Sequence, residues 1–516
     1  MAGVSQPAEL RNTPVEAVPP PRWIAPWLAL LAPLYVISPL ALLALPQLRK
    51  LPTTAKYILA FYAVSQQLPA LFSPEPLLAS LLALARTLLM FGLMGVGVAL
   101  GSSDRLKPFT IGLGVVLVTS LVYFISSTHD LISLRLTHPY MTSTTLGLAG
   151  AIGIWFFLFN TQMSISRILL GISSLGILLF SGSRGALVAL IVSTLLTFLI
   201  ENKHVQRLVI SVSIMLGIAL FTLGQHFEIN SLQRLTNLYT TDRDIIWSDT
   251  FSVIRQAPLS GVGNYLLGRS LSPTSDACKL FPTAEGQVST CPGWLSRLGN
   301  PWLIAHNLTL QQLAESGPLG LTGQLILISF VVANSIASKE SFSIALITGL
   351  IITSTFDNTL LVPSPFFAEL FWITTGIQLS NIYPLKAVDV AVSLAILIVL
   401  ALPLVGIILP QRHFSASLNY LSAARQVSSP NHYTVRTRFV LPIGKYRVNL
   451  RSCTMSCATL ATIPFQVGDQ PSQILTIKVN LRSVKMQRLE LRLFPGESTL
   501  KSVPNNIYIW NVGVQP

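Results

Sequence analysis

Charged residues are scarce in this chain. Only 10% of its 516 residues are Asp, Glu, Lys or Arg, and 51% are hydrophobic, whereas soluble domains carry roughly 25% charged residues. This composition excludes a soluble globular fold and indicates a polytopic membrane protein. The formal net charge of +14 does not by itself indicate nucleic-acid binding, because Lys and Arg in loops also set the orientation of membrane proteins.

The chain also lacks a visible cleavable signal peptide. Residues 1–22 are polar and rich in proline and have no apolar core, so we expect a disordered tail. Residues 23–410 contain repeated apolar runs of the length that crosses a bilayer. They predict a mainly α-helical membrane bundle of about twelve spans, near 25–46, 55–73, 77–100, 108–126, 143–160, 166–180, 186–200, 208–224, 318–336, 341–360, 364–381 and 388–409.

Positive charge is divided unequally between alternate loops. The short loops of one set hold only Arg135 and Arg184. The positive-inside rule places the more basic set on the cytoplasmic side. We therefore expect a large outer loop with amphipathic helices at 225–317 and an outer C-terminal region. The basic set carries Arg49, Lys50, Lys56, Arg105, Lys107, Arg167, Lys203, Arg207, Lys339 and Lys386.

Cysteine is rare, and all four cysteines fall in segments assigned to the outer side. An oxidising compartment there would permit the local pairs Cys278–Cys291 and Cys453–Cys457. Spacing does not fix the connectivity, so four free thiols are the alternative.

Residues 411–516 change to an alternating polar and apolar pattern, as in Ile477 to Arg482. A period of two indicates half-buried β-strands, so we expect an all-β, sandwich-like outer domain of about 100 residues. Its excess of Lys and Arg is either a solvated basic surface or a contact with anionic membrane lipids or an anionic glycan.

A turn with the sequence S-G-S-R-G separates two predicted spans at 181–185. It places Ser183 and Arg184 at the start of a helix, where backbone N–H groups and a guanidinium favour a phosphate. The alternative is a tight turn with an Arg side chain that extends to the membrane surface.

The outer loop contains Arg243 and Trp247, four residues apart and hence on one helix face. Together they can hold a phosphate and a sugar ring. The alternative for Arg243 is a surface ion pair with Asp242 or Asp244, which contributes little stability. The D-x-D spelling of these residues is weak evidence for a metal, and the sequence offers no clear His and carboxylate ligand cluster.

His306 and Asn307 open a helix that is expected to end near Gly317. A neutral histidine there can act as a base, although a lone histidine is more often structural. Glu315 lies nine residues on, about half a revolution away, so we expect it to support helix packing rather than to activate His306. Arg86 lies within a predicted span and faces either a polar cavity or backbone carbonyls.

Together these motifs resemble the O-antigen ligase and polymerase superfamily of bacterial membrane glycan transferases. The resemblance rests on S-G-S-R-G-A-L at a span junction and on R-x-x-x-W and P-L-x-G-V-G in the outer loop. It is completed by A-H-N-L-x-L-Q-x-L-A-E-x-G at 305–317 and covers roughly residues 77–380.

The resemblance implies a transfer enzyme of the bacterial inner membrane that acts at its outer, periplasmic face without metal or other cofactor. The donor would be a polyprenyl-diphosphate-linked glycan, and the acceptor a lipid or a protein. Arg184 and Arg243 would hold the diphosphate, and His306 would activate the acceptor hydroxyl or assist the leaving diphosphate. We expect further substrate contacts from Arg86, Ser183, Trp247 and Asn307.

Three other functions are compatible with parts of this pattern. A polymerase would extend one lipid-linked glycan with another. A secondary transporter of twelve spans is a different class, but the sequence has no internal half-repeat and its long outer loop is unusual for that design. A non-catalytic assembly factor would not need both arginines and the histidine.

Overall fold

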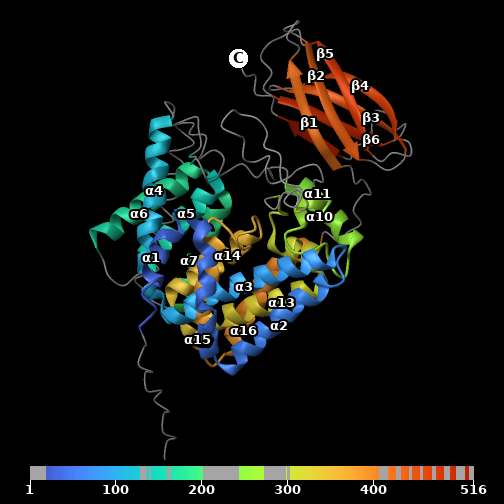
Figure 1. Cartoon of the computed structure of the whole chain (residues 1–516). Helices are drawn as coiled ribbons and strands as arrows, with labels where there is room; N and C mark the ends of the chain where they lie inside the picture. Colours follow the sequence, from blue (N-terminus) through green and yellow to red (C-terminus); the bar gives the residue numbers. More distant parts are fainter. Residues whose placement is uncertain are drawn as a thin grey trace, which may run out of the picture.

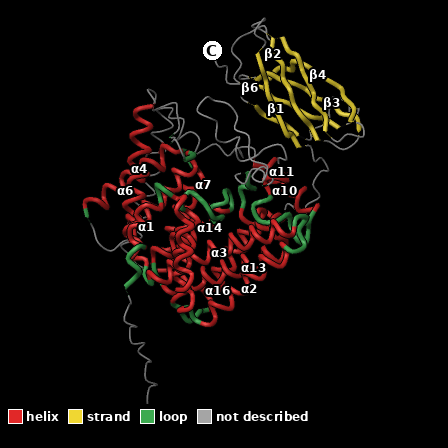
Figure 2. Tube along the Cα trace, in the orientation of Figure 1, coloured by secondary structure: helices red, strands yellow, loops and turns green. Residues whose placement is uncertain are grey.

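The structure, a computed structural model, describes residues 19–127, 136, 138, 141–159, 164–201, 243–271, 298 and 303–405, together with seven strands between 417 and 510. Most of the predicted tail 1–22 and all of the predicted span 208–224 lie outside these residues. Helices make up the first part and strands the second, as Figure 2 shows in red and yellow.

The α-helices and 3-10 helices follow one another with short connections. In chain order they are α1 (Ile24–Leu31), η1 (Tyr35–Lys50), α2 (Thr53–Ala70), α3 (Pro76–Leu100), η2 (Ser103–Leu106), α4 (Lys107–Ser127), α5 (Ser143–Phe159), α6 (Ile165–Ser181), α7 (Arg184–Glu201), α10 (Arg243–Gln256), α11 (Leu267–Leu271), α13 (Leu308–Ser338), α14 (Ser341–Ser354), α15 (Phe367–Ser380), α16 (Ala387–Ala401) and η4 (Leu402–Leu404). Figure 1 shows α2, α3, α13 and α16 close together, and α13 contacts both α2 and α16.

Four described helical segments are long and apolar enough to cross a membrane: Pro76–Leu100, Ser103–Ser126, Leu308–Ser338 and Ala387–Leu404. The predicted fold class, with about twelve spans, is therefore wrong in its span count for the described residues. Apolar content alone does not show where a helix stops. The predicted first span is divided between α1 and η1, and η1 contains two prolines, which remove helical hydrogen bonds. The predicted spans at 341–360 and 364–381 each contain a helix of only 14 residues.

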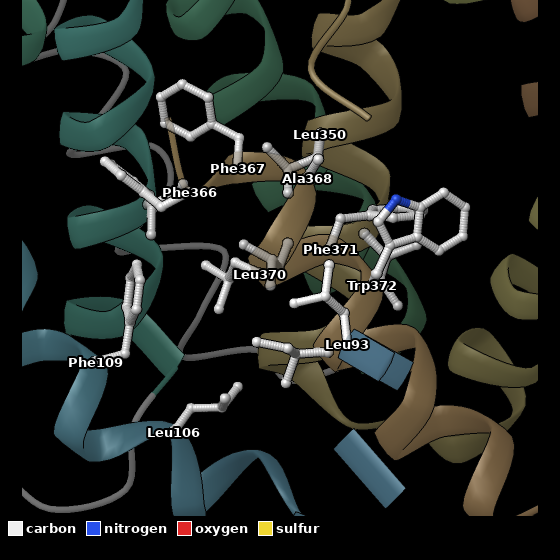
Figure 3. Packing of buried hydrophobic residues seen from close by; sticks show 14 of the residues in the cluster. Leu93, Leu106, Phe109, Leu350, Phe366, Phe367, Ala368, Leu370, Phe371 and Trp372 are labelled. Carbon is white, nitrogen blue, oxygen red and sulfur yellow. The ribbon is translucent and has the colours of Figure 1, made fainter. Parts of the chain in front are cut away.

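The core of the bundle is built around α15. This helix is mainly apolar and is buried on all sides, since its residues from Phe367 to Leu379 are all buried, which is typical of a helix surrounded by protein. Figure 3 shows Phe371 and Trp372 of α15 packed near Leu93 of α3. The bundle therefore holds α3 firmly along much of its length.

Seven strands follow the helices: β1 (Ser417–Arg425), β2 (His432–Val440), β3 (Gly444–Cys453), β4 (Cys457–Val467), β5 (Ser472–Asn480), β6 (Arg488–Pro495) and β7 (Asn506–Trp510). Their ladders are antiparallel and form one sheet in the order β1-β2-β5 and another in the order β4-β3-β6-β7. The prediction of a packed sandwich depends on side chains that lie almost entirely outside the described part of the chain. The register places Cys453 opposite Cys457, whereas Cys278 and Cys291 are outside that part.

The helix α13 is broken near its first third. Gly317 has φ 62° and ψ −171°, outside the helical region, and the next residue is Pro318, which has no N–H. The carbonyls of Ala314 and Glu315 therefore lose their helical partners and must find others.

The loop 257–264 supplies those partners. Val262 N donates to Ala314 O and Gly263 N donates to Glu315 O, each at 2.9 Å. The approach is close enough that a Cβ at Gly317 would lie 2.0 Å from Leu259 O. The broken helix and the outer loop consequently form one unit.

We expect Gly317→Ala to destabilise the protein, because alanine at φ 62° is strained and its Cβ would collide with the loop backbone. The loss should be on the order of 1–3 kcal/mol or more, measured as a lower thermal unfolding temperature in detergent. Gly114→Ala is the control, since it lies in α4 with no atom within 4 Å of an added Cβ. Equal unfolding temperatures for the two variants would contradict this account of the break.

Candidate active site

A buried ion pair joins α3 to α13. Arg86 Nη2 lies 2.5 Å from Glu315 Oε2, and the two side chains are 3% and 0% exposed. Arg86 Nη1 donates to Asn264 Oδ1 at 3.0 Å, and its guanidinium carbon lies 4.1 Å from the ring centroid of Tyr265. Because a buried charge is costly unless it is paired, this contact fixes α3, α13 and the loop 257–265 relative to one another.

The second carboxylate oxygen of Glu315 is also used. Glu315 Oε1 accepts from Tyr265 N at 2.9 Å and from Gln311 Nε2 at 2.6 Å. Burial raises the pKa of Tyr265 above its ordinary value, so its hydroxyl stays protonated and donates to the carbonyl of Val362. Glu315 thus accepts hydrogen bonds from three segments: α3, the loop that contains Tyr265, and its own helix α13.

The residue before His306 is held on both sides of its backbone. Ala305 N donates to Gln311 Oε1 at 2.7 Å, and Ala305 O accepts from Trp247 Nε1 at 3.0 Å. Trp247 belongs to α10 and is half-buried against a hydrophobic cluster that includes Leu310. The indole is therefore engaged with the His306 segment as well as with the cluster.

His306 itself pairs with a residue far along the chain. Its Nδ1 lies 2.9 Å from Asp357 Oδ1, and its side chain is 35% exposed. An ionised carboxylate can only accept hydrogen bonds, so Nδ1 is the donor of this contact, and in the neutral imidazole the lone pair is then on Nε2. This is the arrangement of a histidine that can act as a general base.

Asn307 caps α13 and ties it to the segment that bears Asp357. Its Oδ1 accepts from Leu310 N and its Nδ2 donates to Thr355 O, both at 2.9 Å. Asp357 Oδ1 also accepts from Asn358 N at 2.9 Å. Asn307 is fully buried, so in this structure its amide orients protein groups on either side of the His306 pair.

The S-G-S-R-G turn adjoins the same segment. Gly182 ends α6 in the left-handed conformation, Ser183 is buried, and Arg184 is the first residue of α7. A Cβ added at Gly185 would lie 3.9 Å from Phe356 Cβ, directly beside Asp357 in the chain. The start of α7, where N–H groups favour an anion, therefore lies close to the segment that bears Asp357.

The structure thus gathers Trp247, His306 and Asn307 around the segment 305–307 and its partner segment 355–358. Ser183 and Arg184 belong to the turn whose Gly185 approaches Phe356 of that partner segment. The other predicted residues lie elsewhere or are only partly described. Arg86, Glu315 and Gly317 form the buried support behind the helix. Arg243 begins α10, but its side chain lies outside the described part of the chain.

Sequence reasoning missed Asp357. A signal was present, because Asp357 is one of only two acidic residues between 341 and 381, and ionisable residues in apolar stretches often mark sites. Within the described residues, no group of three or more His, Cys, Asp or Glu side chains is placed to hold a metal ion.

Part of this region resembles a known protein family. Residues 168–325 match the O-antigen ligase family. The match includes the S-G-S-R-G turn, α10, the loop 257–264 and the His306 helix, so the predicted resemblance is confirmed. It supports O-antigen-ligase-like glycan transfer at a general level. With the four long apolar helices, it indicates a membrane protein. No curated protein matches the chain.

The buried pair yields a stability prediction. We expect Arg86→Met to lower the free energy of unfolding by about 3–5 kcal/mol, because it leaves the carboxylate of Glu315 buried without its positively charged partner. The double variant Arg86→Met/Glu315→Gln should lose less than the sum of the two single variants. Thermal unfolding in detergent measures these losses.

The control for this experiment is a second ion pair of the same length. Arg269 Nη1 lies 2.5 Å from Glu75 Oε1, but the side chains are 40% and 41% exposed. Exposed pairs contribute roughly 0–1 kcal/mol, so Arg269→Met should change the unfolding temperature little. Equal losses for Arg86→Met and Arg269→Met would show that burial is not what makes the Arg86 pair important.

Proposed function

We propose that this protein transfers a glycan from a polyprenyl-diphosphate-linked donor to a hydroxyl group of a lipid or protein acceptor. The reaction takes place at the outer face of the bacterial inner membrane. The observation that carries the proposal is the His306–Asp357 pair. His306 and Arg184 lie within the segment 168–325 that matches the O-antigen ligase family, and Gly185 of the Arg184 turn approaches Phe356, the residue before Asp357.

His306 serves as the general base in the proposed reaction. Asp357 holds the Nδ1 proton, and Nε2 removes the proton of the acceptor hydroxyl. The hydroxyl oxygen forms a bond to the anomeric carbon of the donor while the bond from that carbon to the diphosphate breaks. The bonding electrons leave with the polyprenyl diphosphate, so no redox partner is involved.

Arg184 and the first N–H groups of α7 face the charge that develops on the departing diphosphate. Arg243 is proposed as a second cation for the same group. A diphosphate is already a good leaving group, so positioning and charge neutralisation supply most of the needed catalysis. The proposed reaction proceeds without a metal, and transfer rates should be the same with and without EDTA.

Asp357→Asn provides a direct test of the histidine pair. An amide in this place can donate to Nδ1, which favours the wrong tautomer, and we expect transfer to fall by about 10²–10⁴-fold. The assay uses purified protein in liposomes with a radiolabelled polyprenyl-diphosphate glycan and candidate acceptors. His306→Ala and Arg184→Ala should also transfer slowly.

Asp389→Asn is the matched control. Asp389 caps the start of α16, where its Oδ2 accepts from Lys386 N at 2.8 Å, and asparagine can still accept that hydrogen bond. Transfer at the wild-type rate by Asp357→Asn and His306→Ala would refute the assignment of the base. Longer lipid-linked glycans formed without an added acceptor would identify a polymerase. Label that crosses the bilayer with its diphosphate bond intact would identify a transporter.

A further inference from the structure

Gln311 is a buried glutamine of α13, 2% exposed, that no part of the proposed reaction uses. Both ends of its amide are engaged: Oε1 accepts from Ala305 N at 2.7 Å, and Nε2 donates to Glu315 Oε1 at 2.6 Å. It therefore lies between the residue that precedes His306 and the carboxylate that pairs with Arg86.

The direction of this hydrogen-bond chain is fixed by chemistry. A carboxylate that pairs with a guanidinium acts as a hydrogen-bond acceptor, so the amide nitrogen of Gln311 faces Glu315 Oε1. The amide oxygen consequently faces Ala305 N–H, which can only donate. The buried ion pair thus determines the orientation of the Gln311 amide, and the amide determines the position of the Ala305 backbone.

His306 needs such a constraint because its backbone has φ 49°. A non-glycine residue in this region is strained by about 1–2 kcal/mol, and it stays there only when neighbouring contacts hold it. Gln311 and Trp247 hold Ala305 on one side. The Asn307 cap holds the other side. His306 Nε2 is positioned by these contacts together with Asp357.

We propose that Gln311 is a positioning residue for the base, through which the Arg86–Glu315 pair keeps His306 in its strained backbone conformation and its Nε2 aligned for proton transfer. This inference rests on the proposed function, in which His306 is the base. It assigns to Gln311 no contact with donor or acceptor.

Gln311→Met tests the proposal, because methionine has nearly the same length but cannot bridge Ala305 and Glu315. Small misplacements of a catalytic group cost up to about 10²-fold in rate, so kcat should fall by about 10–100-fold while KM for the donor stays within about twofold. Gln311→Asn is the second variant, for use if the methionine variant does not fold. Asparagine retains an amide but is one methylene shorter, so it should lower kcat by a similar factor.

Gln378→Met is the matched control. Gln378 of α15 is also buried, and its Nε2 donates to a glutamate, Glu340 Oε2, at 2.7 Å. Among the described residues, no hydrogen bond joins Gln378 to His306 or Asp357. Wild-type kcat in Gln378→Met, with a thermal unfolding shift like that of Gln311→Met, would separate positioning from general loss of stability.

Combination with His306→Ala gives the sharper test. If Gln311 acts only through His306, the double variant His306→Ala/Gln311→Met should transfer as fast as His306→Ala alone. A further loss as large as that seen in the wild-type background would overturn the proposal, because Gln311 would then act independently of the base.

A measurement without substrate distinguishes failure of this inference from failure of the proposed function. We expect diethyl pyrocarbonate to modify His306 several-fold faster in Gln311→Met than in wild type, relative to His138, and at the wild-type rate in Gln378→Met. An unchanged rate in Gln311→Met overturns the positioning role. If His306→Ala transfers normally while the labelling rate still rises, the positioning contact stands and the role of His306 as base is wrong.

Discussion

A guanidinium inside an apolar bundle requires a carboxylate, and the pairing of Arg86 with Glu315 meets that requirement. One oxygen of Glu315 neutralises the arginine. The other accepts hydrogen bonds from Gln311 and from the backbone of Tyr265. Because one carboxylate serves α3, α13 and the outer loop together, the position of each is set by the same charge. The position of the His306 segment in the bundle therefore depends on this ion pair.

The break in α13 makes this arrangement possible. A continuous helix would satisfy the carbonyls of Ala314 and Glu315 internally and leave nothing for the loop to bind. Gly317 and Pro318 free both carbonyls, and the backbone of the loop 257–264 takes them. The glycine-rich loop motif and the helix motif, about 50 residues apart in the chain, are therefore two halves of one backbone junction.

The local features of this junction could be predicted from sequence, and the long-range ones could not. Periodicity placed Glu315 on the face opposite His306, and the glycine at 317 marked the end of a helix. The true partner of His306 is Asp357, 51 residues away, and no spacing rule connects two residues in separate segments that lie outside the helices. The span count failed for a related reason. Hydropathy measures how apolar a segment is, whereas prolines and buried turns decide where its helix ends.

Two features of His306 bear on its proposed role as the base: its backbone conformation and its exposed ring. His306 shares its positive φ, 49°, with Tyr265, Lys339 and Phe366, so the strain shows that neighbouring contacts hold this backbone and does not by itself mark a reactive residue. The groups around it, Ala305, Asn307 and Asp357, are engaged with protein atoms. The histidine ring itself remains 35% exposed. The carboxylate of Asp357 holds Nδ1, so in the proposed reaction Nε2 is the ring nitrogen that meets the acceptor hydroxyl. The hydrogen bonds of the surrounding groups would then fix the direction of this ring.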